Sequence, residues 1–344
     1  MLSLKEHINR IRQEEWDYYS EIGGKNLQNP FTGKIDHFEF LRQFFSRSGK
    51  SQVLEIMDFL PNGKLDNNRT KHTNSIFFLG ILLYERTNLR SPFFEEENAS
   101  EYRRFPFLWF LACLFHDFGF TIENDRKSIY GIKNIADLKR KYNIQNCLLD
   151  TNPRNVNETL FSLIEPYFDF RLKEHTVIDH GIFAGLFFYD RLKKIRENKF
   201  NQRDTDHFWN QELEEQYAQV ASAIATHNMW LPGEENFDLY RSYELNRLID
   251  DFKPVKFNDF PLLFLLGIVD TIDPMKLYQQ KGFSPDEILR SVYIEFNGES
   301  ITVMNGQKSR LDFKLLIQKA NTLKGWIKAD VEFRDSVIEI KLIQ

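Results

Sequence analysis

The stretch FPFLWFLACLFHDFG, residues 105–119, decides the fold class of this chain. Before its histidine the stretch contains no charged or polar side chain, so a helix formed by it is apolar on every side and must lie inside the protein. The run ends in His116 and Asp117, and Gly119 stands where a helix can stop. Burying an imidazole and a carboxylate without partners costs several kcal/mol. The stretch therefore predicts a helix over 104–117. The cost of burying its polar pair must be offset, either by a metal ion or by a structural pairing of the two side chains.

Four further segments place an imidazole or a carboxylate at or near one end of a predicted buried helix. These are His72 in 72–86, His180 in 179–195, His227 in 214–229 and Asp270 in 260–272. In the third segment Val220, Ile224 and His227 share one helix face by the i, i+4, i+7 rule, so His227 points towards the core. A structural pair can explain one such residue, but the repetition in five predicted helices favours a shared metal site.

The donor types restrict the metals that such a site can hold. Imidazole and carboxylate groups together suit Mn, Fe, Co, Ni or Zn. The chain has 2 cysteines, Cys113 and Cys147, which form no CxxC pair, so an iron–sulfur cluster is not expected. Four histidines and two aspartates are enough for two metal ions that share one carboxylate. We therefore expect two divalent transition-metal ions as cofactors, with Mn or Fe as the first choice.

The overall composition is that of a folded protein. Hydrophobic residues make up 42% and aromatic residues 15% of the 344 residues, enough for a large core, and charged residues make up 28%. The formal net charge of -5 argues against a broad nucleic-acid-binding surface, which needs an excess of Lys and Arg. A local basic pocket for one phosphorylated ligand remains compatible with this charge.

The sequence shows no signal for export or for a membrane. The first residues, MLSLKEHINRIRQEEW, are charged where a signal peptide would be apolar. The longest apolar runs, 105–115 and 260–269, are shorter than the roughly 18–20 residues that span a bilayer. We therefore expect a cytoplasmic protein without a membrane partner.

The pattern of apolar residues divides the chain into a long helical part and a short mixed tail. Residues 3–20 and 34–60 have helical spacing, and the composition changes after about residue 284. The tail predicts strands at 291–296 and 300–304 around Asn297-Gly298, a helix at 311–323, and strands at 327–333 and 336–343. The expected fold is mostly α with a small C-terminal α+β (ββαββ) appendage, in three domains: 1–70, 71–284 and 285–344.

The order of the candidate ligands resembles that of a known superfamily. The order His … His-Asp … His … His … Asp is similar to that of the HD superfamily of metal-dependent phosphohydrolases. The four residues that match its defining set, which holds the first metal, are His72, His116, Asp117 and Asp270; His180 and His227 match the extra pair of its two-metal members. HDFG, DHGIFAG and VDTIDP also resemble the local motifs of the superfamily. The resemblance covers about residues 70–275 and implies an HD-type helical bundle.

The chain departs from the superfamily pattern at two places. Many members carry a lysine shortly after the His-Asp-x-Gly motif, whereas Phe120 follows Gly119 here. A cation that contacts a substrate phosphate must then come from elsewhere, and Lys127 and Arg126 are the candidates. Members that cleave cyclic di-GMP have a second histidine where this chain has Asn228, so that substrate is not expected.

The resemblance implies hydrolysis of a phosphate ester at a dinuclear site. Asp117 would bridge the ions, and His180 and His227 would hold the second ion; these three are the expected catalytic residues. The expected substrate is a nucleotide or another small phosphorylated compound, and an oligomer is possible. An HD-type di-iron oxygenase uses the same ligand set, and a non-catalytic nucleotide sensor that signals through the tail is a third possibility. Because no proposed ligand lies in 285–344, we expect the ligand core to fold without it.

Overall fold

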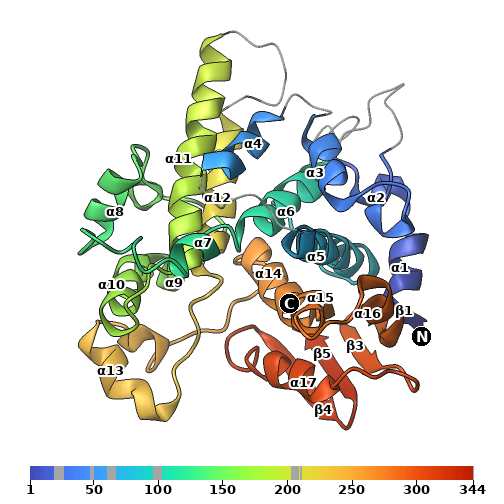
Figure 1. The fold of residues 1–344 in the computed structure, drawn as a ribbon. Helices are drawn as coiled ribbons and strands as arrows, with labels where there is room; N and C mark the ends of the chain where they lie inside the picture. The colour runs from blue at the N-terminus through green and yellow to red at the C-terminus, as the bar shows by residue number, and fades with distance from the viewer. Residues whose placement is uncertain are drawn as a thin grey trace. The chain divides into compact units, whose positions relative to one another are not determined.

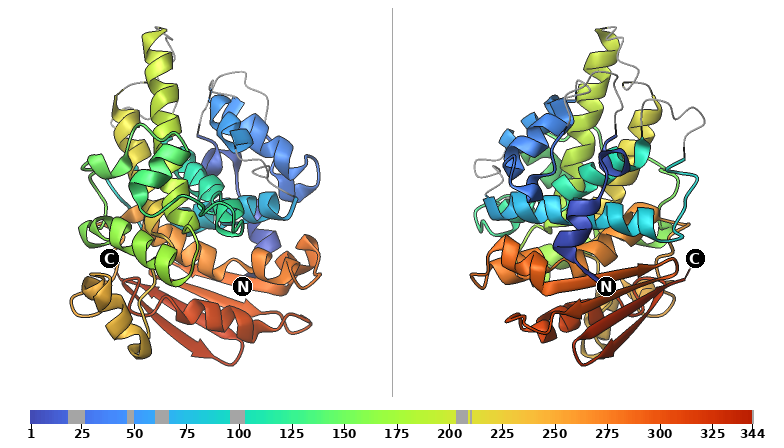
Figure 2. Two further views of the ribbon diagram at one scale, coloured as in Figure 1. Left: turned by 60° about the vertical axis from the view of Figure 1, so that its left-hand side comes forward. Right: turned by 90° about the vertical axis from the view of Figure 1, so that its right-hand side faces the viewer.

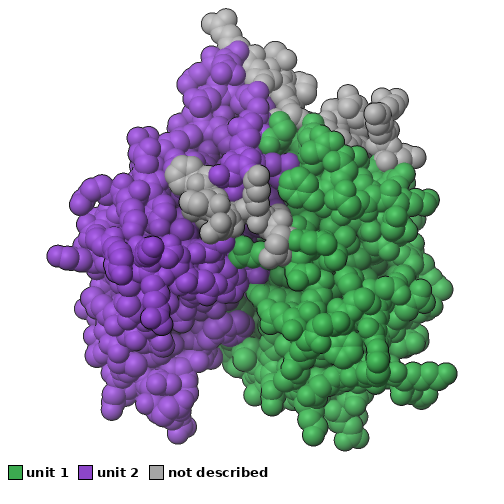
Figure 3. Space-filling view, viewed as in Figure 1, with its two compact units in different colours: residues 1–51, 65–113, 256–344 green, residues 52–64, 114–255 purple. Residues whose placement is uncertain are grey.

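The computed structural model describes residues 1–18, 27–46, 50–59, 67–95, 103–202, 209 and 211–343. This part of the chain is mostly helical, and its strands form one small antiparallel sheet that lies largely in the C-terminal part (Figure 1). The chain forms two compact units (Figure 3): the first contains residues 1–51, 65–113 and 256–344, and the second contains 52–64 and 114–255. The expected fold class, mostly α with a small appendage that contains strands, is confirmed.

The first unit is organised around one long helix. Its described helices are α1 (Leu4–Arg10), α2 (Gln13–Trp16), η1 (Pro30–Thr32), α3 (His37–Ser46), α5 (Asn67–Arg86), α14 (Pro261–Ile272), α15 (Pro274–Gln279), α16 (Pro285–Ser291) and α17 (Phe313–Asn321), and α6 (Arg104–Phe115) begins in it. Residues 72–84 of α5 are all buried, and α1, α2, α3, α14 and α15 contact this helix. Phe77 of α5 stacks on Phe110 of α6 with ring centroids 4.0 Å apart. The apolar run of α5 therefore forms the core of this unit.

The sheet also belongs to the first unit. In the described residues it has five strands in the order β1-β2-β3-β5-β4, namely β1 (Leu2–Ser3), β2 (Val292–Asn297), β3 (Ser300–Asn305), β5 (Val337–Leu342) and β4 (Ala329–Arg334). Val303 is opposite Ile294 on one side and Ile338 on the other, and all three are buried. Since side chains alternate along a strand, these residues form one apolar face. Helix α17 contacts β4 and β5 (Figure 2).

The predicted elements of the tail are confirmed, and one strand was missed. Both hairpins and the helix between them lie within two residues of their expected limits. The fifth strand comes from the other end of the chain: Leu2 and Ser3 pair with Ile294 and Tyr293. The helical pattern over 3–20 is instead divided between α1 and α2. A strand of two residues has no periodicity to detect, so pairing alone reveals it.

The predicted domain boundaries do not coincide with the limits of the compact units. The sheet, α16 and α17 lie in the same unit as α1 and α5. The sequence predicts that the chain divides at 70/71 and 284/285 into independently folding domains, and this stays a prediction.

The second unit is built on two helices that pack against each other, α11 (His180–Asn201) and α12 (Glu212–Thr226). The shorter described elements are α4 (Gln52–Glu55), η2 (Ile56–Phe59), α7 (Phe120–Glu123), α8 (Ile135–Lys141), η3 (Leu148–Asp150), α9 (Glu158–Ser162), α10 (Ile164–Glu174), η5 (Glu234–Asn236), α13 (Phe237–Ser242) and η6 (Asn246–Leu248). Helix α7 and η3 contact α11, and α9 contacts α12. Residues 123–157 and 231–258 form loops with short helices.

Within the described residues, one helical stretch is long and apolar enough to cross a membrane by length and composition. It is Arg104–Glu123, 20 residues that include α6, α7 and the turn between them, and 83% of its most apolar part is buried inside the protein. The expectation that every apolar run is too short therefore needs this correction. Burial of that extent is typical of a core helix of a soluble protein.

Candidate metal centre

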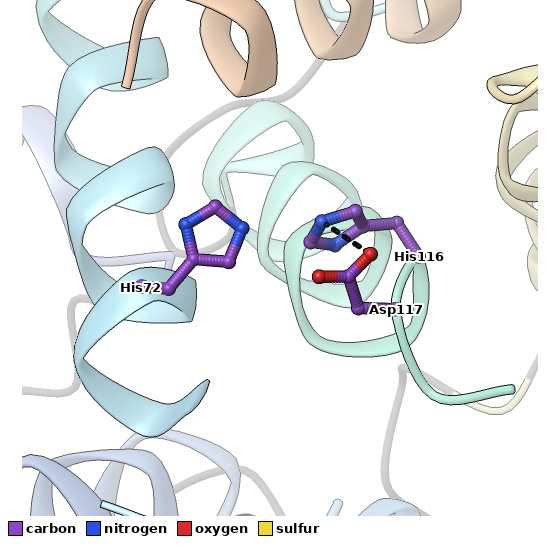
Figure 4. Close-up of side chains that lie close together, drawn as sticks. All are labelled: His72, His116 and Asp117. Atoms are coloured by element: carbon purple, nitrogen blue, oxygen red, sulfur yellow. Dashed lines mark ion pairs between the residues drawn. The ribbon is translucent and has the colours of Figure 1, made fainter. Parts of the chain in front are cut away.

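The His116-Asp117 pair lies directly after α6. The helix ends at Phe115, two residues earlier than expected, so His116 and Asp117 stand in the turn that leads to α7. His116 Nε2 lies 3.4 Å from Asp117 Oδ1, the ion pair that Figure 4 marks. His116 is fully buried, whereas the Asp117 side chain is 14% exposed. Asp117 is therefore the member of the pair that solvent can reach.

Two further predicted ligands lie close to this carboxylate in the second unit. His180 is the first residue of α11, and His227 is the residue directly after α12. His180 Nε2 lies 3.3 Å from His227 Nε2 and 3.8 Å from Asp117 Oδ1. Each of the three residues offers one ligand atom within 4.8 Å of the others. The His116 and His227 rings also approach, with centroids 5.5 Å apart. The fold thus brings together four of the six predicted ligands.

The orientation of the two imidazole rings fits a bound cation. His180 Nδ1 lies 2.6 Å from Glu123 Oε2, and His227 Nδ1 lies 2.7 Å from the Ile224 carbonyl oxygen. Because oxygen acceptors hold both Nδ1 atoms as N–H donors, each Nε2 presents a lone pair. Two lone pairs that face each other at 3.3 Å repel, unless a proton or a metal ion lies between them. Two imidazoles and a carboxylate are ligands that divalent transition metals accept.

The two histidines differ in their tendency to take up a proton. Burial lowers the pKa of His227 to about 3, helped by the nearby His180 and His116 rings, so His227 is neutral and able to ligate a metal. Burial also opposes the charged form of His180, but the hydrogen bond to Glu123 and the carboxylates around it outweigh burial and raise the pKa of His180. A metal ion that binds here would displace a proton from His180 rather than from His227.

The remaining two predicted ligands face each other in the first unit. His72 lies on α5 (Figure 4), in its second turn rather than at its start, because the helix begins at Asn67. His72 Nε2 lies 3.3 Å from Asp270 Oδ1, and its Nδ1 lies 2.9 Å from Asp273 Oδ2. Burial disfavours the charged imidazole, but the two carboxylates raise the pKa of His72 to about 9. The first unit therefore pairs an imidazole with a carboxylate in a buried position.

Two aspartates that flank the predicted ligands have double roles. They are Asp179, which precedes His180, and Asp273, which lies three residues after Asp270. Asp273 caps α15 by accepting from Met275 N and Lys276 N, and it also accepts from His72. Asp179 caps α11, where it accepts from the main chain of Gly181 and Ile182, and it also pairs with residues outside α11. Asp273 therefore both caps a helix and holds a predicted ligand, whereas Asp179 caps the helix that begins with His180 and, within the described residues, contacts no predicted ligand side chain directly.

Gly119 has a different role from the one expected. Its φ of -74° is right-handed, so it does not end α6 through a left-handed conformation. A Cβ atom at this position would overlap the main-chain carbonyl oxygen of His180. The glycine therefore allows the turn that carries Asp117 to approach the start of α11. Next to it, Phe120 stacks on the His180 ring with centroids 3.9 Å apart.

The sequence alone did not indicate two charged residues at this centre. Glu123, at the end of α7, and Arg171, on α10, form an ion pair of 2.5 Å beside His180. No spacing in the sequence indicates either residue. Arg126 and Lys127, the expected phosphate contacts, are exposed in the turns after α7.

Comparisons with known proteins found no family model, no curated protein and no solved structure that matches this chain. The class of protein that fold and site define is therefore a mostly helical protein with buried His/Asp clusters that could hold metal. Membership of the HD superfamily remains an interpretation of the sequence.

Proposed function

We propose that the chain is an HD-type, dinuclear metal-dependent hydrolase that acts on a phosphate ester of a nucleotide or another small phosphorylated compound. One observation carries the proposal: His180 Nε2 and His227 Nε2 converge beside the Asp117 carboxylate, with both Nδ1 atoms held by oxygen acceptors. This arrangement presents two imidazole nitrogens and a carboxylate to one point, as a metal-binding site requires. The HD assignment rests on the order of the six candidate ligands along the chain.

The ligand roles follow the resemblance residue by residue. The first ion would be bound by His72, His116, Asp117 and Asp270, and the second by Asp117, His180 and His227. Asp117 is shared because it is the carboxylate of the HD pair, and its 14% exposure leaves it accessible to a small ligand. We expect Mn or Fe, with Co, Ni or Zn as alternatives that the same donors accept.

The chemistry follows from the donors and the charges around them. When bound, the two ions would supply Lewis acidity and lower the pKa of a water molecule to near neutrality. The chain itself keeps His227 neutral and holds the His180 ring against Glu123. Arg126 and Lys127 are the proposed phosphate contacts, and their exposed position lets them reach a ligand in solution. The proposal places the protein in the cytoplasm, and an oligomer is compatible with it.

Metal content tests the binding part of the proposal. Protein purified without added metal should carry close to two transition-metal ions per chain by elemental analysis. Asp117→Ala should lose both ions, whereas His180→Ala and His227→Ala should keep the first and lose the second. His175→Ala, at an exposed histidine next to α10, is the matched control and should keep both. Full metal content in His180→Ala and His227→Ala would make these histidines structural.

An anaerobic assay separates the hydrolase from its alternatives. Metal-stripped protein is reconstituted with Mn or with Fe and tested for phosphate release from nucleotides and simple phosphodiesters. A hydrolase needs no oxygen and no change of metal valence, so Mn should support turnover. Activity confined to Fe with O2 would replace the proposal by the di-iron oxygenase. Nucleotide binding without turnover under any metal would favour the sensor.

A further inference from the structure

Helix α10 presents an arginine to two acidic residues that hold the start of α11. Arg171 Nη2 donates to Glu123 Oε1 at 2.5 Å, and Arg171 Nε lies 3.4 Å from Asp179 Oδ2. The other oxygen of Glu123, Oε2, accepts from His180 Nδ1 at 2.6 Å. Asp179 precedes His180 and caps α11. One guanidinium is thus connected both to the carboxylate that holds the His180 ring and to the residue that begins its helix.

The same face of α10 also contacts the chain beside His227. Tyr167 Oη donates to the Asn228 carbonyl oxygen at 3.1 Å, and the Asn228 side-chain amide donates to Asp179 Oδ2 at 2.9 Å. Tyr167 and Arg171 are four residues apart and therefore lie on one side of the helix. This side of α10 contacts the residues next to both members of the His180–His227 pair.

The acidic group around Arg171 resembles a metal site but already contains a cation. Glu123, Asp179 and His180 have ligand atoms close enough to hold an ion. The guanidinium of Arg171 stands beside both carboxylates, and its rigid fork of donors suits such a pair. The Asp179 side chain is 1% exposed and that of Glu123 is 11% exposed, so the pairing is largely shielded from water. The group is an ion-pair network, and it acts on the histidine rather than on a third ion.

We propose that α10 is the positioning element of the His180–His227 pair, and that Glu123, held by Arg171, is the positioning residue that orients the His180 ring. The inference rests on the proposed function, because it concerns the His180 atom that would bind the second ion. A carboxylate on Nδ1 fixes which nitrogen carries the proton, restricts rotation of the ring and makes Nε2 a stronger donor. The ion pair with Arg171 keeps that carboxylate in place while the ring is free of metal.

A calorimetric titration of Mn into the metal-stripped full-length protein tests the role of Glu123. His180→Ala should abolish one of the Mn-binding steps. In Glu123→Gln, the Mn affinity of that same step should fall by about 10–100-fold. Glu123→Asp keeps the charge on a shorter side chain and should lose less. Glu165→Gln, an exposed position on α10, is the matched control and should bind like the wild type. The absorption spectrum of the Co(II)-loaded protein, which reports ligand geometry, should change in Glu123→Gln and not in the control.

The outcomes separate this inference from the proposed function. Wild-type protein that binds no transition metal would overturn both. Wild-type protein that binds metal, together with a Glu123→Gln variant of unchanged affinity and unchanged Co(II) spectrum, would overturn the inference alone. If circular dichroism shows that Glu123→Gln is unfolded, Glu123→Asp decides by the same measurements. Loss of the fold in both variants would assign Glu123 a structural role and overturn the inference.

Discussion

Three of the candidate ligands are histidines whose Nδ1 atoms are held by two kinds of partner. The partner is the Glu123 carboxylate for His180, a main-chain carbonyl for His227 and the Asp273 carboxylate for His72. A carboxylate stabilises the charged imidazole, whereas a carbonyl in a buried place does so much less. Burial opposes the charged form of His72, but its carboxylate partners outweigh burial and raise the pKa of His72 to about 9. Burial and the neighbouring His180 and His116 rings lower the pKa of His227 to about 3, which its carbonyl partner does not offset. Histidines with similar burial therefore differ in charge near neutral pH.

We predict that the side chain of Arg171 stabilises the metal-free protein. Arg171→Met should lower the free energy of unfolding of the metal-free protein by about 3 kcal/mol, because it leaves Glu123 and Asp179 without their shared cation. Lys173→Met on the same helix removes an exposed pair with Asp169 and should cost about 0–0.5 kcal/mol. Urea denaturation of both variants measures the difference. Equal and small losses would show that the network around Arg171 adds little to stability.

At the scale of elements, most candidate ligands stand at the ends of helices rather than inside them. His116 and Asp117 follow α6, His180 begins α11, His227 follows α12, and Asp270 lies in the last turn of α14. Helix ends leave main-chain groups that need partners, and short turns let two helices approach closely there. His72 is the exception, since it lies within α5. The positions of the ligands therefore depend on caps and turns as much as on the helices.

We predict that the turn between α6 and α7 does not tolerate a side chain at Gly119. Gly119→Ala adds a methyl group against the His180 main chain, which cannot move without shifting α11. The variant should lose about 1–3 kcal/mol of stability, typical of overpacking, and should bind the second metal more weakly because Asp117 moves away from His180. Asn124→Ala, exposed at the end of α7, is the control. Thermal unfolding and Mn titration check both effects, and a Gly119→Ala protein with wild-type behaviour would contradict the close-approach argument.

At the scale of the first unit, helix α17 and the residues that follow it contact α14, the helix that carries Asp270. A Cβ atom at Gly267, one turn before Asp270, would lie 2.5 Å from Trp326 Cζ3, and Trp326 is fully buried. Lys319 Nζ donates to the Asp270 carbonyl oxygen at 2.6 Å and so caps the end of α14. The tail is thus packed against a ligand-bearing helix, which its ββαββ pattern did not indicate.

This packing changes the expectation for a truncated chain. Removing residues 285–344 should give an insoluble or unfolded protein, because the deletion exposes the side of α14 that Trp326 covers and leaves β1 without β2. Trp326→Ala in the full chain should lower the free energy of unfolding by about 3–5 kcal/mol, whereas Trp326→Phe should lose less. Circular dichroism and denaturation measure these effects. A soluble, helical and metal-binding 1–284 fragment would restore the original expectation of a separable tail.

The sequence by itself determined the helices that carry the candidate ligands and the strands of the tail. The run predicted at 260–272 forms α14 at Pro261–Ile272, since a proline opens it and Pro274 prevents its continuation. The strand predicted at 291–296 is β2 at Val292–Asn297. These predictions succeed because hydrophobic periodicity and turn residues are local properties, which a single sequence contains in full.

Only the tertiary structure decided which side chains stand beside the ligands. Glu123 and His180 are 57 residues apart, and Glu123 and Arg171 are 48 residues apart. Periodicity shows which face of one helix is apolar, but it contains no information on which helix packs against that face. The positions of Glu123 and Arg171 follow from how α7 and α10 pack around the start of α11, and the pairing of β1 with β2 likewise joins the two ends of the chain. Such long-range contacts arise from packing, which no local pattern records.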